Sequence, residues 1–100
     1  MTGWTQGEVL VTHDQGLHAR PSVRLTKLAK GFAGAIEISG LADGPWVDAK
    51  SIVKVMGLKV RQGAVLHVRA KGGDAAAALT AVTGLVRRDF DEDLAHAANG

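Results

Sequence analysis

Residues 15–23, with the sequence QGLHARPSV, place a histidine, an arginine and a proline within one turn of chain. Pro21 suits the first turn of a helix, because the N–H that proline lacks would have no partner there. Gly16 permits a sharp change of chain direction just before that turn. His18 is therefore predicted at or next to the residue that caps a helix beginning at Ala19.

A helix N-terminus presents unpaired N–H groups and the positive end of the helix dipole, so it favours an anion. The N–H groups of Ala19, Arg20 and Ser22 are the candidate donors, and the guanidinium of Arg20 suits phosphate oxygens. Together they indicate that His18 attacks a phosphoryl donor and holds the product as a phosphoimidazole. Because a nitrogen–phosphorus bond is labile, the group would then be passed on.

The rest of the chain contains no P-loop or kinase signature and no acidic cluster that would hold magnesium. The active sites that donate and accept the phosphoryl group are therefore expected in partner proteins. Two plainer interpretations of His18 stay open on the residues alone: an ordinary surface histidine, or a helix cap without chemistry.

Apolar periodicity predicts the elements that must position this stretch. Four strands are predicted at residues 8–13, 35–39, 46–47 and 64–70, and three helices at residues 19–31, 48–58 and 75–88. Asp48 or Ser51 is expected to cap the second helix, and Asp74 the third. Residues 1–7 are expected to be flexible, and residues 89–100 to form a mostly disordered acidic tail.

The resulting order, β-α-β-β-α-β-α, predicts an α+β fold. Alternating strands need one covered face, and three helices with one apolar stripe each can cover it. We therefore expect a two-layer open-faced β-sandwich, in which a four-stranded antiparallel sheet is covered on one face by three helices.

Composition bounds the remaining possibilities. The chain has 100 residues, a formal net charge of +2 and no cysteine, which is typical of one folded domain without disulfides or thiolate metal sites. The charge does not demand a nucleic-acid partner, and no apolar run is long enough to insert in a membrane. His13, His67 and His96 show no metal-ligand spacing with His18. A cytoplasmic, monomeric protein without cofactor or metal is expected.

Two motifs carry a resemblance to a known family. The stretch GLHARPS resembles the phosphorylation-site motif of the HPr family, the histidine-containing phosphocarriers of the bacterial phosphotransferase system. The stretch AKSIVKVMGL resembles the second signature of that family, and the two stand about thirty residues apart, as they do there. The resemblance extends over residues 8–88 and implies the same element order.

The resemblance implies a role for each matched residue. His18 would be phosphorylated through Nδ1, and Arg20 would contact the phosphate. Enzyme I would be the donor and Enzyme IIA-type proteins the acceptors in sugar uptake. Ser51 matches a regulatory serine that a dedicated kinase and phosphorylase modify in many relatives, although a plain helix N-cap is an equal alternative for it.

Two other functions stay open beside this one. The first is a regulatory HPr paralogue of a nitrogen- or carbon-control branch, and the second is an interaction module whose histidine is never phosphorylated. A carrier needs one docking surface for several partners, and we predict it on the first two predicted helices, at Val23, Arg24, Lys27, Lys30, Val53, Lys54 and Met56.

Three features depart from the pattern of the family. The connection SGLADGPW is slightly long, and Lys54 stands where relatives often carry a small or apolar residue. The chain also continues beyond Arg88, past the usual end of the family.

Overall fold

The computed structural model of the chain describes residues 3–14 and 16–91. Its elements are β1 (Thr5–Leu10), α1 (Ala19–Lys30), β2 (Ile36–Ser39), β3 (Val47–Asp48), α2 (Ile52–Gly57), β4 (Val65–Ala70), α3 (Ala75–Arg87) and a closing 3-10 turn, η1 (Asp89–Asp91). The predicted order of strands and helices is confirmed.

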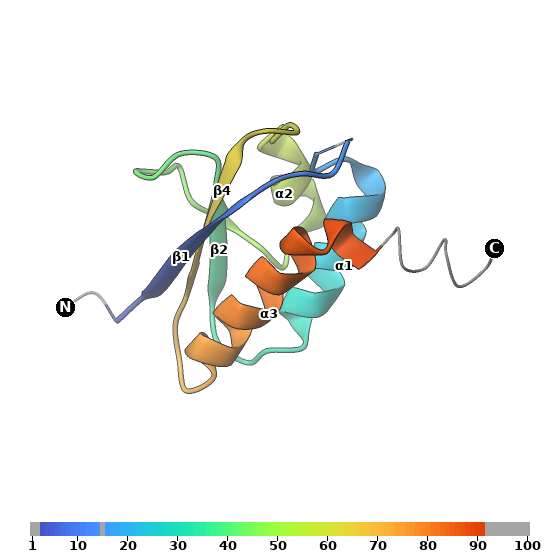
Figure 1. Cartoon of the computed structure of the whole chain (residues 1–100). Coiled ribbons are helices and arrows are strands. Elements are labelled where there is room, and N and C mark those ends of the chain that lie inside the picture. The colour runs from blue at the N-terminus through green and yellow to red at the C-terminus, as the bar shows by residue number, and fades with distance from the viewer. Residues whose placement is uncertain (1–2, 15, 92–100) are drawn as a thin grey trace.

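The four strands form one antiparallel sheet in the order β1-β4-β2-β3. The last strand in the sequence, β4, lies between β1 and β2. The sheet therefore forms only when segments distant in the sequence pair with one another. Figure 1 shows α1, α2 and α3 on one side of this sheet. The opposite side, which we call the open face, carries no helix of the described residues. The predicted α+β sandwich is confirmed.

The core lies between the sheet and the helices. Alternation along β4 buries Leu66 and Val68 and turns His67 and Arg69 toward the open face. The helices contribute apolar stripes at a spacing of three and four residues. Their fully buried members are Leu25 and Ala29 of α1, Val55 of α2, and Val82 and Val86 of α3.

The first strand begins earlier than the sequence pattern predicted. β1 spans Thr5–Leu10, and Thr5 is paired with Ala70 at the end of β4. The expectation that residues up to Gly7 are flexible is therefore wrong for Thr5, Gln6 and Gly7. A polar, glycine-containing segment shows no local strand signal, and its order comes from pairing with β4.

The caps of α2 and α3 also differ from simple expectation. Ser51, and not Asp48, caps α2, which begins at Ile52, four residues after the predicted start. The Asp48 carboxylate instead accepts a bond from the Lys50 N–H at 2.9 Å. Asp74 stands at the N-cap position of α3 without capping it, because its carboxylate accepts from the N–H of Ala33 at 3.0 Å.

The end of the described chain is part of the core. Phe90 is fully buried, and Asp89 to Asp91 form η1 directly after α3. The expectation of a disordered tail from residue 89 is wrong for this turn, because one buried aromatic side chain anchors it. The remainder of that expected tail, residues 92–100, lies outside the described residues.

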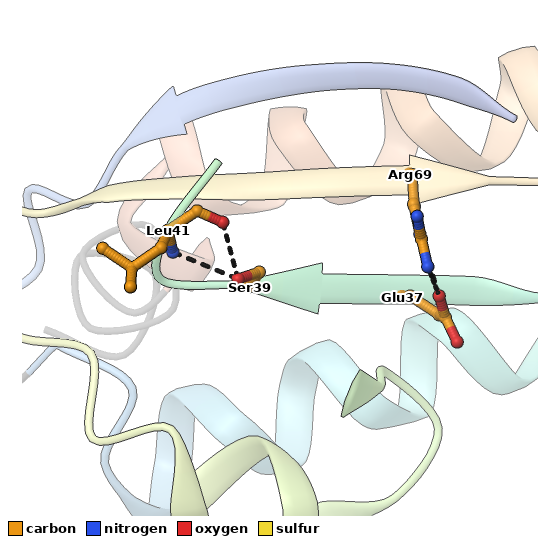
Figure 2. Close-up of polar contacts among 4 residues, drawn as sticks. All are labelled: Glu37, Ser39, Leu41 and Arg69. Atoms are coloured by element: carbon orange, nitrogen blue, oxygen red, sulfur yellow. Dashed lines mark hydrogen bonds and ion pairs between the residues drawn. The ribbon is translucent and has the colours of Figure 1, made fainter. Parts of the chain in front are cut away.

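The open face carries a stacked cluster that the sequence did not reveal. The Arg69 guanidinium carbon lies 4.3 Å from the ring centroid of Trp4 and 4.2 Å from that of Trp46. Arg69 also donates from Nε to Glu37 Oε1 at 2.8 Å, as Figure 2 shows. Trp4 precedes β1 and Trp46 precedes β3, so the cluster joins the two edges of the sheet.

The connection after β2 is fixed at its start by one side chain. The Ser39 hydroxyl donates to the Leu41 carbonyl at 2.7 Å and accepts from the Leu41 N–H at 3.1 Å (Figure 2). The chain then reaches Trp46 through a cis bond between Gly44 and Pro45. The long connection thus delivers one of the two indoles that enclose Arg69.

Candidate phosphohistidine site

The loop between β1 and α1 is fastened to the segment before β4. Val11 accepts from the Gly63 N–H at 2.8 Å and donates to the Ala64 carbonyl at 2.9 Å. The Leu17 N–H donates to the Val60 carbonyl at 2.9 Å. These bonds hold both ends of the loop, so the residue that follows Leu17 has a defined position.

Gly16 allows the loop to make this approach. Its φ is +59°, and a Cβ atom at this position would collide with the carbonyl oxygen of Val60. A left-handed backbone and a close contact with another backbone both require glycine here. The sharp turn predicted from the sequence is confirmed.

His18 is the N-cap residue of α1, as predicted. Its backbone is extended, with φ −80° and ψ −171°, and its carbonyl accepts the first helical bond from the Ser22 N–H at 2.9 Å. The imidazole is exposed and makes no capping bond within the part of the chain described. The ring therefore stands at the helix N-terminus without being occupied as a cap.

Two of the three predicted phosphate donors are available. Among the described residues, the N–H groups of Ala19 and Arg20 have no acceptor, as expected for the first two positions of a helix. Ser22 is a correction: its N–H is bonded to His18, and its buried hydroxyl donates to the Leu17 carbonyl at 3.0 Å. Ser22 therefore supports the turn and offers no donor to a phosphate.

Arg20 supplies the one guanidinium in the first turn of α1. It is exposed, as is Ala19, whereas Pro21 next to it is buried. A buried proline fixes the backbone of this turn, so the exposed Arg20 and the two N–H groups without an acceptor in the described chain belong to the turn that His18 caps. This set can stabilise a dianionic group on a ring nitrogen of His18.

The predicted docking residues are all exposed. Val23 is 42%, Val53 78% and Met56 39% accessible. Arg24, Lys27 and Lys30 on α1 and Lys54 on α2 are also exposed. The two helices pack against one another, so these residues lie on adjoining elements.

Ser51 is half-buried at the start of α2, where its side chain accepts from the Lys54 N–H at 3.4 Å. The plain cap interpretation is thus confirmed as a structural role. A cap position is also a place where added negative charge is tolerated, so a second, regulatory role is compatible with it.

The other two described histidines, His13 and His67, each lie beside a carboxylate of the chain. His13 is buried, with its Nδ1 3.5 Å from the Asp14 carboxylate and its ring edge-on to Phe90. His67 lies on the open face, 3.7 Å from the Glu8 carboxylate. Within residues 3–14 and 16–91, no group of side chains is arranged to hold a metal ion, and no helix is long and apolar enough to cross a membrane.

An exposed histidine at a helix N-cap, on an open-faced sandwich, is the arrangement that the sequence predicted for a histidine phosphocarrier. The profile of the family described as "PTS HPr component phosphorylation site" matches residues 5–88. The phosphocarrier protein HPr of Xylella fastidiosa strain 9a5c is 38% identical over 86 residues, which cover 86% of this chain and 94% of that protein.

Longer proteins and solved structures agree. The multiphosphoryl transfer protein of Vibrio cholerae is 44% identical over 73 residues, and this chain covers 18% of its length. The crystal structure of HPr-C-His from Thermoanaerobacter tengcongensis superimposes with a TM-score of 0.81 at 33% identity, covering 88% of this chain and 97% of that one. The chain belongs to the HPr family, the phosphocarriers of the phosphotransferase system.

Proposed function

We propose that this phosphocarrier accepts a phosphoryl group on His18 from an Enzyme I-type donor and passes it to Enzyme IIA-type acceptors. The observation that carries the proposal is the position of His18: an exposed imidazole at the N-cap of α1, next to the N–H groups of Ala19 and Arg20, which have no acceptor among the described residues. The family profile described as "PTS HPr component phosphorylation site" matches residues 5–88, a range that includes His18.

The transfer is balanced without any further reactant. A ring nitrogen of His18 attacks phosphorus, the bond to the donor breaks, and the displaced electron pair leaves with the donor group. The first-turn N–H groups and Arg20 then oppose the charge of the phosphate. A nucleophile of the acceptor then attacks the phosphorus, the nitrogen–phosphorus bond breaks, and the electron pair returns to the imidazole. We assign no small-molecule substrate or cofactor to the chain, which acts as a relay and not as an enzyme by itself.

The exposed residues of α1 and α2 supply the docking surface in this proposal. Val23, Val53 and Met56 provide apolar area, and an adaptable methionine suits a surface that meets several partners. Arg24, Lys27, Lys30 and Lys54 would steer acidic partners toward it. Ser51, at the start of α2, would be the site where a serine kinase lowers this attraction.

The decisive experiment is incubation of the protein with phosphoenolpyruvate and Enzyme I, followed by intact mass measurement. A mass increase of one phosphoryl group, mapped to His18 and absent from His18→Ala, supports the proposal. An unmodified parent protein would support the unphosphorylated interaction module, and phosphate on another histidine would refute the assignment of His18.

A second measurement separates the two branches of the phosphotransferase system. The phosphorylated protein is mixed with a sugar-type and a nitrogen-type Enzyme IIA, and loss of phosphate from His18 is followed for each. Transfer to the sugar-type acceptor supports a role in sugar uptake, whereas selective transfer to the nitrogen-type acceptor identifies a regulatory paralogue. The cytoplasmic location and monomeric state expected from the sequence remain predictions.

A further inference from the structure

The turn after α3 lies outside the region that the family profile matches, which ends at residue 88. In this turn Asp89 has a φ of +53° and Phe90 a φ of +59°. Two consecutive residues other than glycine in the left-handed region are unfavourable in isolation. The surrounding contacts must therefore select this conformation.

Those contacts are made with the loop that leads to His18. The Thr12 hydroxyl donates to the Asp89 carboxylate, and the buried Phe90 ring meets the edge of the His13 ring, with centroids 5.7 Å apart. η1 also packs against α1 itself. On its other side the same loop is tied down by Gln62, whose Nε2 donates to the Thr12 carbonyl at 3.1 Å.

We propose that Asp89 and Phe90 are positioning residues for His18: the terminal turn braces the loop between β1 and α1 and thereby holds the imidazole beside the free N–H groups of α1. Neither residue touches the reacting atoms. The His13 carbonyl accepts from the Gly16 N–H at 2.9 Å, and Leu17 and His18 follow Gly16 directly, so a shift of His13 is transmitted to the imidazole. The inference rests on the proposed phosphorylation of His18.

In this proposal the brace acts on the orientation of the imidazole, and neither the partly buried Asp89 nor the buried Phe90 belongs to the predicted docking residues of α1 and α2. Displacement of a reacting group by about one ångström can cost about a hundredfold in rate. For Phe90→Ala we therefore expect the kcat of phosphorylation by Enzyme I to fall about tenfold, while the KM for the carrier changes less than about twofold. A residue that only stabilised the fold would change neither constant in the folded protein.

The matched control is Leu79→Ala. Leu79 belongs to α3, which precedes the turn, and its partly buried side chain packs over Gly7 of β1. This variant should lose stability as Phe90→Ala does and keep the parent kcat. All rates are measured well below the melting temperature of the least stable variant.

Milder variants test the hydrogen bond without removing the buried ring, and they serve if Phe90→Ala does not fold. Thr12→Val and Asp89→Ala should each lower kcat. Because both remove the same hydrogen bond, the double variant should have the same kcat as the single variants. Thr12→Ser and Asp89→Asn keep a donor and an acceptor and should have the kcat of the parent. Additive losses, or a normal kcat in all of these folded variants, would overturn the brace.

Nuclear magnetic resonance of the unphosphorylated proteins separates this inference from the proposed function. Phe90→Ala and Thr12→Val should shift the His18 ring and the Ala19 and Arg20 amide resonances, and Leu79→Ala should not. If Enzyme I fails to phosphorylate the parent, the proposed function fails, but these shifts still decide whether the turn positions His18. Unshifted His18 resonances in both variants would contradict the brace directly.

Discussion

The start of α1 and the open face of the sheet differ in whether their polar groups are paired. On the open face, Arg69 is enclosed by Trp4 and Trp46 and bonded to Glu37. At the start of α1, the imidazole of His18 and the N–H groups of Ala19 and Arg20 are left for solvent within the described chain. Satisfied groups stabilise a fold, whereas groups held in place and left unpaired are ready for a ligand.

The difference is also one of support. The exposed groups at the start of α1 stand on a loop fastened by backbone bonds to residues 60–64. Ser22 is an example of such support. Its N–H and its hydroxyl both donate within the turn, so neither is available to bind a phosphate. Backbone and Ser22 groups that are already hydrogen-bonded therefore make the site rigid. The neighbouring groups that are not hydrogen-bonded in the described chain are the ones that can bind a phosphate.

The largest effect is expected for His18→Ala. If this variant kept its activity, the unpaired groups at the start of α1 would have no special role compared with the open face. Because His18 is exposed and caps nothing with its side chain, the variant should keep the melting temperature and lose all phosphoryl transfer. Circular dichroism and transfer from phosphorylated Enzyme I measure the two properties. A variant that still accepts phosphate would show that the unpaired region is not the site.

Arg20→Ala should come next. A hydrogen bond between a charged group and phosphate contributes about 1.5–3 kcal/mol, which corresponds to roughly ten- to a hundredfold in rate if it acts in the transition state. Transfer should slow by this factor while the fold is unchanged, as read by single-turnover kinetics. Unchanged kinetics would leave the backbone donors as the whole phosphate site.

Ser51→Asp should have a smaller effect on transfer. Aspartate keeps an acceptor at the start of α2, and its charge at a helix N-terminus favours folding by about 0.3–1 kcal/mol. The same charge should repel an acidic donor, so binding to Enzyme I weakens at low salt and recovers at high salt. Ser51→Ala is the uncharged control, and it should lose the cap without this salt dependence.

A melting temperature that drops by several degrees in Ser51→Asp would show that aspartate cannot replace the serine cap. Transfer kinetics equal to those of the parent at low salt would place α2 outside the docking surface.

Arg69→Met should have the smallest effect on transfer and a measurable one on stability. It removes a partly exposed ion pair with Glu37, of about 0–1 kcal/mol, and stacking on two indoles, of about 0.5–1 kcal/mol each. We expect a loss of roughly 1–3 kcal/mol on this additive basis, changed tryptophan fluorescence and normal transfer. Slower transfer in the folded variant would mean that the two regions are coupled.

Local patterns in the sequence determined the order of the elements, the apolar stripes of the helices and the place of His18. These properties follow from residues that are neighbours in the chain: helical spacing at Leu25 and Ala29, a first-turn proline at Pro21 and a flexible Gly16. Local chemistry at a helix start was therefore predictable for the position of His18 and for the N–H groups of Ala19 and Arg20, but not for Ser22, whose N–H is bonded to His18.

The tertiary structure alone decided what distant residues do together. Pairing with β4 ordered Thr5, Gln6 and Gly7, which show no alternation of apolar and polar residues. Trp4 and Trp46 precede the two edge strands, β1 and β3, and meet Arg69 of β4, which lies between those edges. Phe90 becomes core because the turn after α3 packs against the loop before His18. Such contacts depend on strand register and helix packing, which no spacing within a short window encodes.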